Sequence, residues 1–206
     1  ARFNLKFPME SIELTRGSWV RFDGYTVTAF SVHHGIPALG YVLEEDPRPG
    51  RFNHEQAIAL GVPPGPLFGR LQRGETVTVG SGEDRKEIKP DQVMGTARPG
   101  RKIVYTGDTR AIPPDAMDSA RDADLLIHDA TYDESEAQRA AEFYHATAGQ
   151  AGETATALSA CTLALVHISS RYTDPVAHIS DAQKRYSGTI IAPKDLDMFE
   201  VLFRDE

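Results

Sequence analysis

Three residues of the types that bind metal ions stand where strands are predicted to end. His34 follows the segment TAFSVH, Asp108 follows KIVYTG, and His167 lies within LALVHISS. Loops converge at the ends of strands in an open α/β sheet, so side chains from distant segments can meet there on a rigid support. Two imidazoles and a carboxylate suit Zn²⁺, although spacing alone leaves a hydrogen-bonded core or surface histidine as the alternative for each imidazole.

The elements that would position these residues differ between the two ends of the chain. Residues 18–31 predict an antiparallel hairpin that turns at Asp23-Gly24, a type I′ signal, and residues 40–44 predict a further strand. After Gly100, strands and helices alternate, which predicts helices packed on a largely buried sheet. The predicted strands are 101–108, 123–131, 163–169, 189–193 and 198–203, and the predicted helices are 113–122, 134–160 and 175–186. A break near residues 147–149 would divide the second helix, with Thr147 as a cap.

Regular patterning is lost between these two parts. Glycine and proline recur from Asp46 to about Arg98, and only EQAIALG indicates a helical turn or two. An excursion of this length is more often functional than idle.

Composition limits the class of protein. A chain of 206 residues that is 40% hydrophobic and 25% charged can build one buried core, and no apolar run is long enough to span a membrane. We therefore expect a soluble globular protein. The single cysteine, Cys161, is interpreted as a core thiol, which suits a reducing compartment, and no signal peptide follows Ala1, so the cytoplasm is the expected location.

The net charge of −8 is unlike that of simple nucleic-acid binders. The sign of the charge is weak evidence, because a local patch can bind an anionic substrate on an otherwise acidic surface. Of the 22 basic residues, 16 are arginine, which is the better bidentate partner for phosphate.

Six strings occur in a fixed order from about Gly24 to the C-terminus. They are HGIPALGY from His34, GPLFG from Gly65, YTGDTR from Tyr105, HDATY from His128, HATA from His145 and HISSRY from His167. Together they resemble the ribonuclease Z family, tRNA 3′-end processing endonucleases of the metallo-β-lactamase superfamily. The resemblance implies a mixed α/β (α+β) fold, the C-terminal part of an αβ/βα sandwich with a protruding Gly/Pro-rich arm.

The resemblance also implies roles for individual residues. His34, Asp108 and His167 would be metal ligands, with Asp108 bridging two zinc ions. His145 and Asp129 would be catalytic, although the family usually has Glu and Phe where this chain has Asp129 and Tyr132. His128 is interpreted as a buried, hydrogen-bonded strand residue. His33, His54 and His178 receive no role.

The arm and its neighbours would contact RNA. In this interpretation residues 1–206 are a single partial metallo-β-lactamase domain, and residues 46–98 are an inserted substrate-binding arm. Gly65, Pro66 and Arg70 on the arm, with Arg171 near a ligand, would meet the RNA. For the basic side chains of the arm, ordinary solvated charges are an equal alternative.

One part of the family pattern is missing. The His-x-His-x-Asp-His motif, which supplies most zinc ligands in the family, does not occur in this sequence. The missing part would lie on another chain, would have been lost from this one, or would be absent in a truncated and inactive protein. An isolated chain is expected to expose apolar surface and to be unstable alone.

The leading hypothesis is a zinc-dependent endoribonuclease that removes the 3′ trailer from precursor tRNA and leaves a 3′-hydroxyl on the tRNA. The resemblance implies a homodimer in which one subunit's arm presents tRNA to the other's active site. Two alternatives remain open, another metallo-β-lactamase-fold phosphodiesterase or hydrolase, and a non-catalytic RNA-binding fragment.

Overall fold

The computed structural model describes residues 10–110 and 118–204. The chain divides into two compact units: a sheet unit, Ala1–Glu45 with Arg101–Glu206, and an inserted unit, Asp46–Gly100. Each unit is described by itself. No helix in the described ranges is long and apolar enough to cross a membrane.

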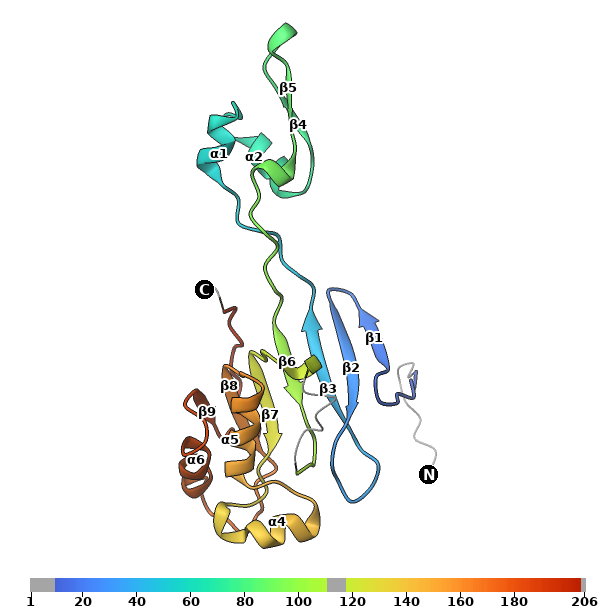
Figure 1. Ribbon diagram of the computed structural model, residues 1–206, viewed down its shortest axis with the longest axis vertical. Coiled ribbons are helices and arrows are strands. Elements are labelled where there is room, and N and C mark those ends of the chain that lie inside the picture. Colours follow the sequence, from blue (N-terminus) through green and yellow to red (C-terminus); the bar gives the residue numbers. More distant parts are fainter. Residues whose placement is uncertain (1–9, 111–117, 205–206) are drawn as a thin grey trace. The chain divides into compact units, whose positions relative to one another are not determined.

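The sheet unit is built on a sheet of seven strands in the order β1-β2-β3-β6-β7-β8-β9 (Figure 1). Strands β1, β2, β3 and β6 pair antiparallel, and β6 to β9 pair in parallel. Their bounds are Trp19–Phe22, Tyr25–Ser31, Leu39–Glu45, Lys102–Tyr105, Leu125–Asp129, Thr162–Val166 and Thr189–Ile191. The predicted mixed α/β class is confirmed.

The predicted hairpin at the start of the sheet is confirmed, but its turn type is not. Phe22 pairs with Tyr25, so Asp23 and Gly24 form a two-residue loop. A type I′ turn needs positive φ at both loop residues. Of the two loop residues only Gly24 is left-handed, at φ 83°, so the turn is not type I′.

Helices cover one face of the parallel strands. Helix α5 (Ala148–Ala157) packs on β7 and β8, and α6 (Val176–Gln183) packs on α5 and β9 (Figure 1). The facing side chains are small on α5 and large on the strands, which lets the helix approach closely. Gly152 lies at a close contact between α5 and α6, since a Cβ there would lie 2.8 Å from the carbonyl oxygen of Ala182 on α6. The buried core comprises Phe30, Val42, Val104, Leu126, Leu163, Leu165, Ala148, Ala151, Ala155 and Leu158, among others.

The helical region after β7 divides as expected. Helix α4 (Ala137–Phe143) follows the short 3₁₀ turn Glu134–Glu136, and α5 follows at Ala148. Thr147 caps α5: its hydroxyl accepts from the backbone N–H of Gln150, and the Gln150 side chain accepts from the Thr147 N–H. The cap prediction is confirmed, while the break itself lies just before the cap. The helix predicted for residues 113–122 lies largely outside the described residues.

Two sequence predictions, for residues 198–203 and for Cys161, are wrong. Residues 198–203 form no strand: they make no backbone ladder with the sheet, and Met198, Phe199 and Leu202 are exposed. Arg204 Nε donates to Asp124 Oδ1 at 2.6 Å, and the Arg101 guanidinium lies 4.7 Å from the centre of the Phe203 ring. Cys161 is exposed rather than buried, because it precedes β8 at the edge where that strand begins.

The inserted unit has its own small core. It contains α1 (His54–Ala59), α2 (Pro66–Gln72), the hairpin of β4 (Val77–Val79) and β5 (Lys86–Ile88), and two 3₁₀ turns, Gly82–Asp84 and Pro90–Gln92. Ala57, Val62, Leu71, Val77, Val79, Ile88 and Val93 are buried together. Only α1 was predicted. The hairpin was missed because its strands are three residues long, which is too short to show the two-residue alternation of a strand.

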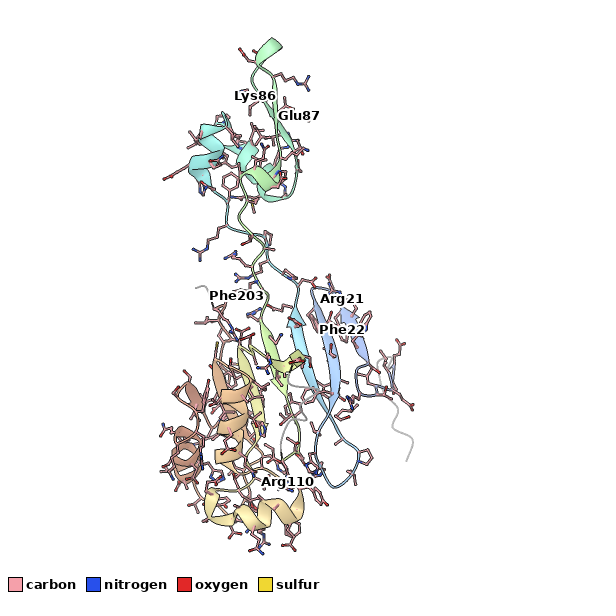
Figure 2. The ribbon with its side chains drawn as sticks, in the orientation of Figure 1. Arg21, Phe22, Lys86, Glu87, Arg110 and Phe203 are labelled. Carbon is pink, nitrogen blue, oxygen red and sulfur yellow. The ribbon has the colours of Figure 1, made fainter. Side chains whose placement is uncertain are left out.

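The two ends of the inserted unit run side by side. Arg48 and Arg98 exchange backbone hydrogen bonds of 2.7 and 2.9 Å. A Cβ on Gly50 would clash with the carbonyl oxygen of Gly95, so the close approach requires glycine. Figure 2 shows the side chains of this unit, with Lys86 and Glu87 exposed on β5.

Candidate active site

The candidate residues follow strands that run in the same direction. Asp108 comes three residues after β6, Asp129 ends β7, and His167 directly follows β8. β2 also runs in this direction, because it is antiparallel to β3 and β3 is antiparallel to β6. His34, three residues beyond β2, is therefore carried to the same edge of the sheet.

The structure brings the predicted residues together around His145. Potential ligand atoms of His34, Asp108 and His145 lie within 4.8 Å of one another, and so do those of Asp129, His145 and His167. His167 Nε2 is 3.7 Å from Asp108 Oδ1. The His145 ring is 5.2 Å from the His34 ring and 5.1 Å from the His167 ring, centre to centre.

Asp129 is the buried anchor of this cluster. Its side chain is fully buried and accepts four hydrogen bonds. Oδ1 accepts from Thr131 N at 2.8 Å and from Thr131 Oγ1 at 2.6 Å. Oδ2 accepts from Thr109 N at 3.0 Å and meets His145 Nδ1 at 2.8 Å. A carboxylate so occupied orients its neighbours rather than coordinating a metal.

Every histidine of the cluster has a partner at Nδ1. His145 Nδ1 meets Asp129, His34 Nδ1 lies 3.1 Å from the carbonyl oxygen of Tyr144, and His167 Nδ1 lies 2.8 Å from Thr131 Oγ1. Carboxylate and carbonyl oxygens only accept, so His34 and His145 carry their ring proton on Nδ1 when neutral. That leaves Nε2 with a lone pair. The Nε2 of His34 in this state, beside the Asp108 carboxylate, gives a nitrogen and an oxygen donor of the kind that fits Zn²⁺.

Left-handed backbone occurs at three places in the site. Gly107 precedes Asp108 at φ 62°, Tyr144 precedes His145 at φ 58°, and His167 itself has φ 59°. For residues other than glycine this conformation costs roughly 1–2 kcal/mol. Such strain is typical of functional sites, where the surrounding structure over-determines the backbone.

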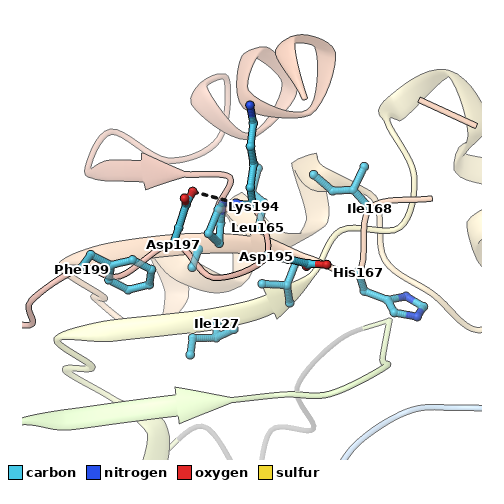
Figure 3. Close-up of a pocket in the computed structure, with 11 residues that line it drawn as sticks. Ile127, Leu165, His167, Ile168, Lys194, Asp195, Asp197 and Phe199 are labelled. Carbon is cyan, nitrogen blue, oxygen red and sulfur yellow. Dashed lines mark hydrogen bonds between the residues drawn. The ribbon is translucent and has the colours of Figure 1, made fainter. Parts of the chain in front are cut away.

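A pocket of about 510 Å³ adjoins His167 (Figure 3). Ile127, Val166 and Phe199 give it apolar walls, and Lys194 and Asp195 add charged groups. Of the cluster residues, His167 alone lines this pocket.

The residues predicted to bind RNA lie in different settings. Arg171 Nε donates to Ser169 Oγ at 3.1 Å, and its guanidinium lies 5.3 Å from the centre of the Tyr132 ring. The Tyr132 ring is in turn 6.4 Å from that of His145, which places Arg171 one side chain away from the cluster.

The other three residues predicted to bind RNA belong to the inserted unit. Gly65 precedes α2 with φ 146°, and Pro66 is the first residue of that helix. Arg70 Nε is bound to Glu75 Oε2 at 2.8 Å, and this hydrogen bond lowers the pKa of Glu75. Arg70 is thus paired with a carboxylate of its own unit and is not a free positive charge.

Two histidines are buried apart from the cluster. His128 is fully buried, as expected, with Nδ1 2.7 Å from the carbonyl oxygen of Asp129, and burial lowers its pKa. His178 on α6 is fully buried against the Tyr172 ring, and burial lowers its pKa as well. Neither reaches the cluster.

The sequence interpretation missed three contributors. Thr131 and Thr109 hold Asp129, and the carbonyl of Tyr144 holds His34. Thr131 lies within the HDATY string quoted above, so the sequence could have indicated it, but no role was predicted for it. A backbone carbonyl carries no side-chain signal at all.

Comparisons with known proteins agree with this fold. A protein-family model described as a beta-lactamase superfamily domain matches residues 74–168. The metallo-beta-lactamase fold protein YhfI from Bacillus subtilis superposes with a TM-score of 0.57 at 14% identity, covering 90% of this chain and 53% of that chain. Human tRNase Z, short form, gives a TM-score of 0.52 at 20% identity, covering 89% of this chain and 46% of that one. The fold is that of the metallo-β-lactamase proteins.

Sequence comparison identifies relatives of this chain within the metallo-β-lactamase fold. Proteins named Ribonuclease Z are 48% identical over 99% of this chain in Methanosarcina acetivorans and 46% identical over 98% in Myxococcus xanthus. Over these residues, this chain is a homologue of proteins named Ribonuclease Z. It spans 65% of the length of each of these two relatives.

Proposed function

We propose that this chain forms part of a zinc-dependent endoribonuclease that removes the 3′ trailer from precursor tRNA. The observation that carries the proposal is the cluster at one edge of the sheet, in which His34, His145 and His167 all have Nδ1 occupied and stand beside Asp108. The names of the relatives give the substrate class.

His34, Asp108 and His167 would hold the metal ions, with Asp108 shared between two zinc ions in the complete site. Nitrogen and oxygen ligands of this kind suit zinc. Zinc held there would supply Lewis acidity to the phosphoryl oxygens and to the water that attacks phosphorus. The remaining steps belong to side chains of this chain.

His145 would act as the general acid. Asp129 accepts a 2.8 Å hydrogen bond from His145 Nδ1, which would orient the ring so that Nε2 can give a proton to the leaving oxygen. That oxygen is the 3′ oxygen of the tRNA, and its protonation yields the 3′-hydroxyl product. The trailer would leave with a 5′-phosphate.

The inserted unit would be the substrate-binding arm, comprising residues 46–98. Its own buried core supports this role, since a separately packed unit can project a binding surface. Gly65, Pro66 and Arg70 would meet the tRNA there. Arg171, fixed against Tyr132, would clamp a phosphate near the scissile bond.

The complete active site needs more ligands than this chain supplies. The relatives are longer, and we propose that the further ligands come from sequence outside these 206 residues. A homodimer in the cytoplasm, with one subunit's arm serving the other's site, is the assembly we propose.

The test is cleavage of a 3′-extended precursor tRNA by the intact protein with added zinc, with both product ends mapped. We expect one cut after the acceptor stem, lost on chelation and in Asp108→Ala, while Asp108→Ala still binds tRNA. Retained turnover in Asp108→Ala would refute the ligand assignment.

A second substrate separates this proposal from a small-molecule hydrolase. Arg70→Ala should weaken tRNA cleavage and leave hydrolysis of a small aryl phosphodiester unchanged, because the arginine would contact only tRNA. Equal losses on both substrates would favour the small-molecule hydrolase. Binding of tRNA by a protein that takes up no zinc would instead indicate a non-catalytic RNA-binding protein.

A further inference from the structure

We propose that Thr131 is a positioning residue that fixes the tautomer and orientation of His167, and thereby presents His167 Nε2 to the metal site. The proposal rests on the proposed function in taking His167 as a metal ligand. Its evidence is the hydrogen-bond network around one buried hydroxyl.

Thr131 holds the His167 loop at two points. Its hydroxyl oxygen lies 2.8 Å from His167 Nδ1, and its carbonyl accepts from Ser169 N at 3.1 Å. Only 6% of the residue is exposed, so water does not compete strongly for these groups. The two bonds lie on either side of Ile168 and together restrain the left-handed turn at His167.

The proton count determines the tautomer. A threonine hydroxyl has one proton and can donate only once. Asp129 Oδ1, 2.6 Å away, belongs to a carboxylate, which only accepts, so the Thr131 hydroxyl donates its proton to Asp129. The hydroxyl oxygen must then accept from His167, which places the imidazole proton on Nδ1.

That tautomer leaves a lone pair on Nε2. His167 Nε2 lies 3.7 Å from Asp108 Oδ1, on the side of the ring that faces the cluster. If the proton sat on Nε2 instead, it would point toward the carboxylate, and the nitrogen could not bind a metal without losing it. Thr131 therefore selects the metal-binding form of His167.

A purely structural role for Thr131 makes a different prediction. If the residue only closed the end of β7, its loss would lower stability and leave the His167 tautomer and zinc affinity unchanged. The tautomer is thus the observation that separates the two roles.

The experiment uses intact metal-free protein labelled with ¹⁵N-histidine, and reads ring tautomers by long-range ¹H–¹⁵N correlation. The His167 signal is assigned by its loss in His167→Gln. We expect the Nδ1–H form in the wild type and in Thr131→Ser, which keeps the hydroxyl. In Thr131→Val we expect a population of the Nε2–H form to emerge. Observation of mainly Nε2–H in the wild type would overturn the proposal without any Thr131 variant.

Zinc affinity gives a second readout, by competition with a chromophoric chelator. Loss of a partner that orients a metal-bound histidine typically weakens metal binding about 10–100-fold, and we expect this range for Thr131→Val. Thr131→Ser should stay close to the wild type. Thr154→Val is the matched control, because it removes a hydroxyl that donates to the Gln150 carbonyl at 3.0 Å, on α5.

The outcomes distinguish this proposal from the proposed function. A Thr131→Val protein that folds, keeps the Nδ1–H form and binds zinc as tightly as the wild type would overturn the role of Thr131. If Thr131→Val does not fold, Thr131→Ala carries the same test. A protein that shows the expected tautomer and zinc effects but cleaves no tRNA would refute the proposed function alone.

Discussion

Replacing Asp129 with asparagine tests the hydrogen-bond network with almost no change of shape. The carboxylate accepts four hydrogen bonds, two at each oxygen. An amide has one accepting oxygen and one NH₂ that only donates. Whichever way the new amide points, two former donors face its NH₂ group.

Both orientations lead to one lost backbone hydrogen bond and one changed histidine. With NH₂ on the Oδ2 side, His145 can switch tautomer and accept, but Thr109 N–H is left without its acceptor. With NH₂ on the Oδ1 side, the Thr131 hydroxyl can accept and turn its proton to His167, but Thr131 N–H loses its acceptor. An unsatisfied buried N–H costs about 1–3 kcal/mol.

We therefore expect Asp129→Asn to lower the free energy of unfolding by about 1–3 kcal/mol, which is roughly 2–12 °C in melting temperature for a chain of this size. Urea unfolding followed by circular dichroism measures the loss. Asp118→Asn is the control, because the Asp118 side chain is 90% exposed and should change stability by less than about 0.5 kcal/mol.

The tautomer measurement makes the prediction specific. Either His145 or His167 should show the Nε2–H form in Asp129→Asn. Wild-type stability together with unchanged tautomers at both histidines would refute the reasoning, because an amide cannot accept all four hydrogen bonds.

Two further predictions concern packing and pH. Gly152→Ala should destabilise the sheet unit by about 1–3 kcal/mol in urea unfolding, because its Cβ would lie 2.8 Å from the Ala182 carbonyl oxygen. The control is Gly69→Ala, which should be neutral or stabilising, because its Cβ meets only the end of the Arg73 side chain at 3.4 Å. Burial lowers the pKa of His178, so the unfolded chain binds a proton first as the pH falls; stability should be full above about pH 6.5 and decline below it, with a shallower decline in His178→Phe. Equal pH slopes for His178→Phe and the wild type would contradict the second of these.

The sequence was sufficient to predict the strands that carry the site, because buried strands in a parallel sheet are continuous apolar runs. KIVY, LLIH and TLALV are mostly apolar, and each is followed within three residues by a residue of the candidate site. The same reasoning failed at residues 198–203, where no backbone ladder forms and Met198, Phe199 and Leu202 are exposed.

The outer layer of the site was harder to predict for a physical reason. His34 is held by the carbonyl of Tyr144, more than a hundred residues away, and every residue type has that carbonyl. The left-handed conformation of Tyr144 could not be predicted from its residue type either, since tyrosine does not favour φ 58°. Such features depend on tertiary structure and leave no local pattern.

Asp129 couples two histidines that a list of ligands would treat as independent. One of its oxygens reaches His145 directly, and the other reaches His167 through the Thr131 hydroxyl. A change in the proton held by either ring therefore alters the charge that the shared carboxylate presents to the other. Substitutions at Asp129 and Thr131 should for this reason not add, because each removes part of the same chain of hydrogen bonds. The shorter acid in this chain still makes a 2.8 Å contact with His145, so the coupling does not require the longer side chain of glutamate.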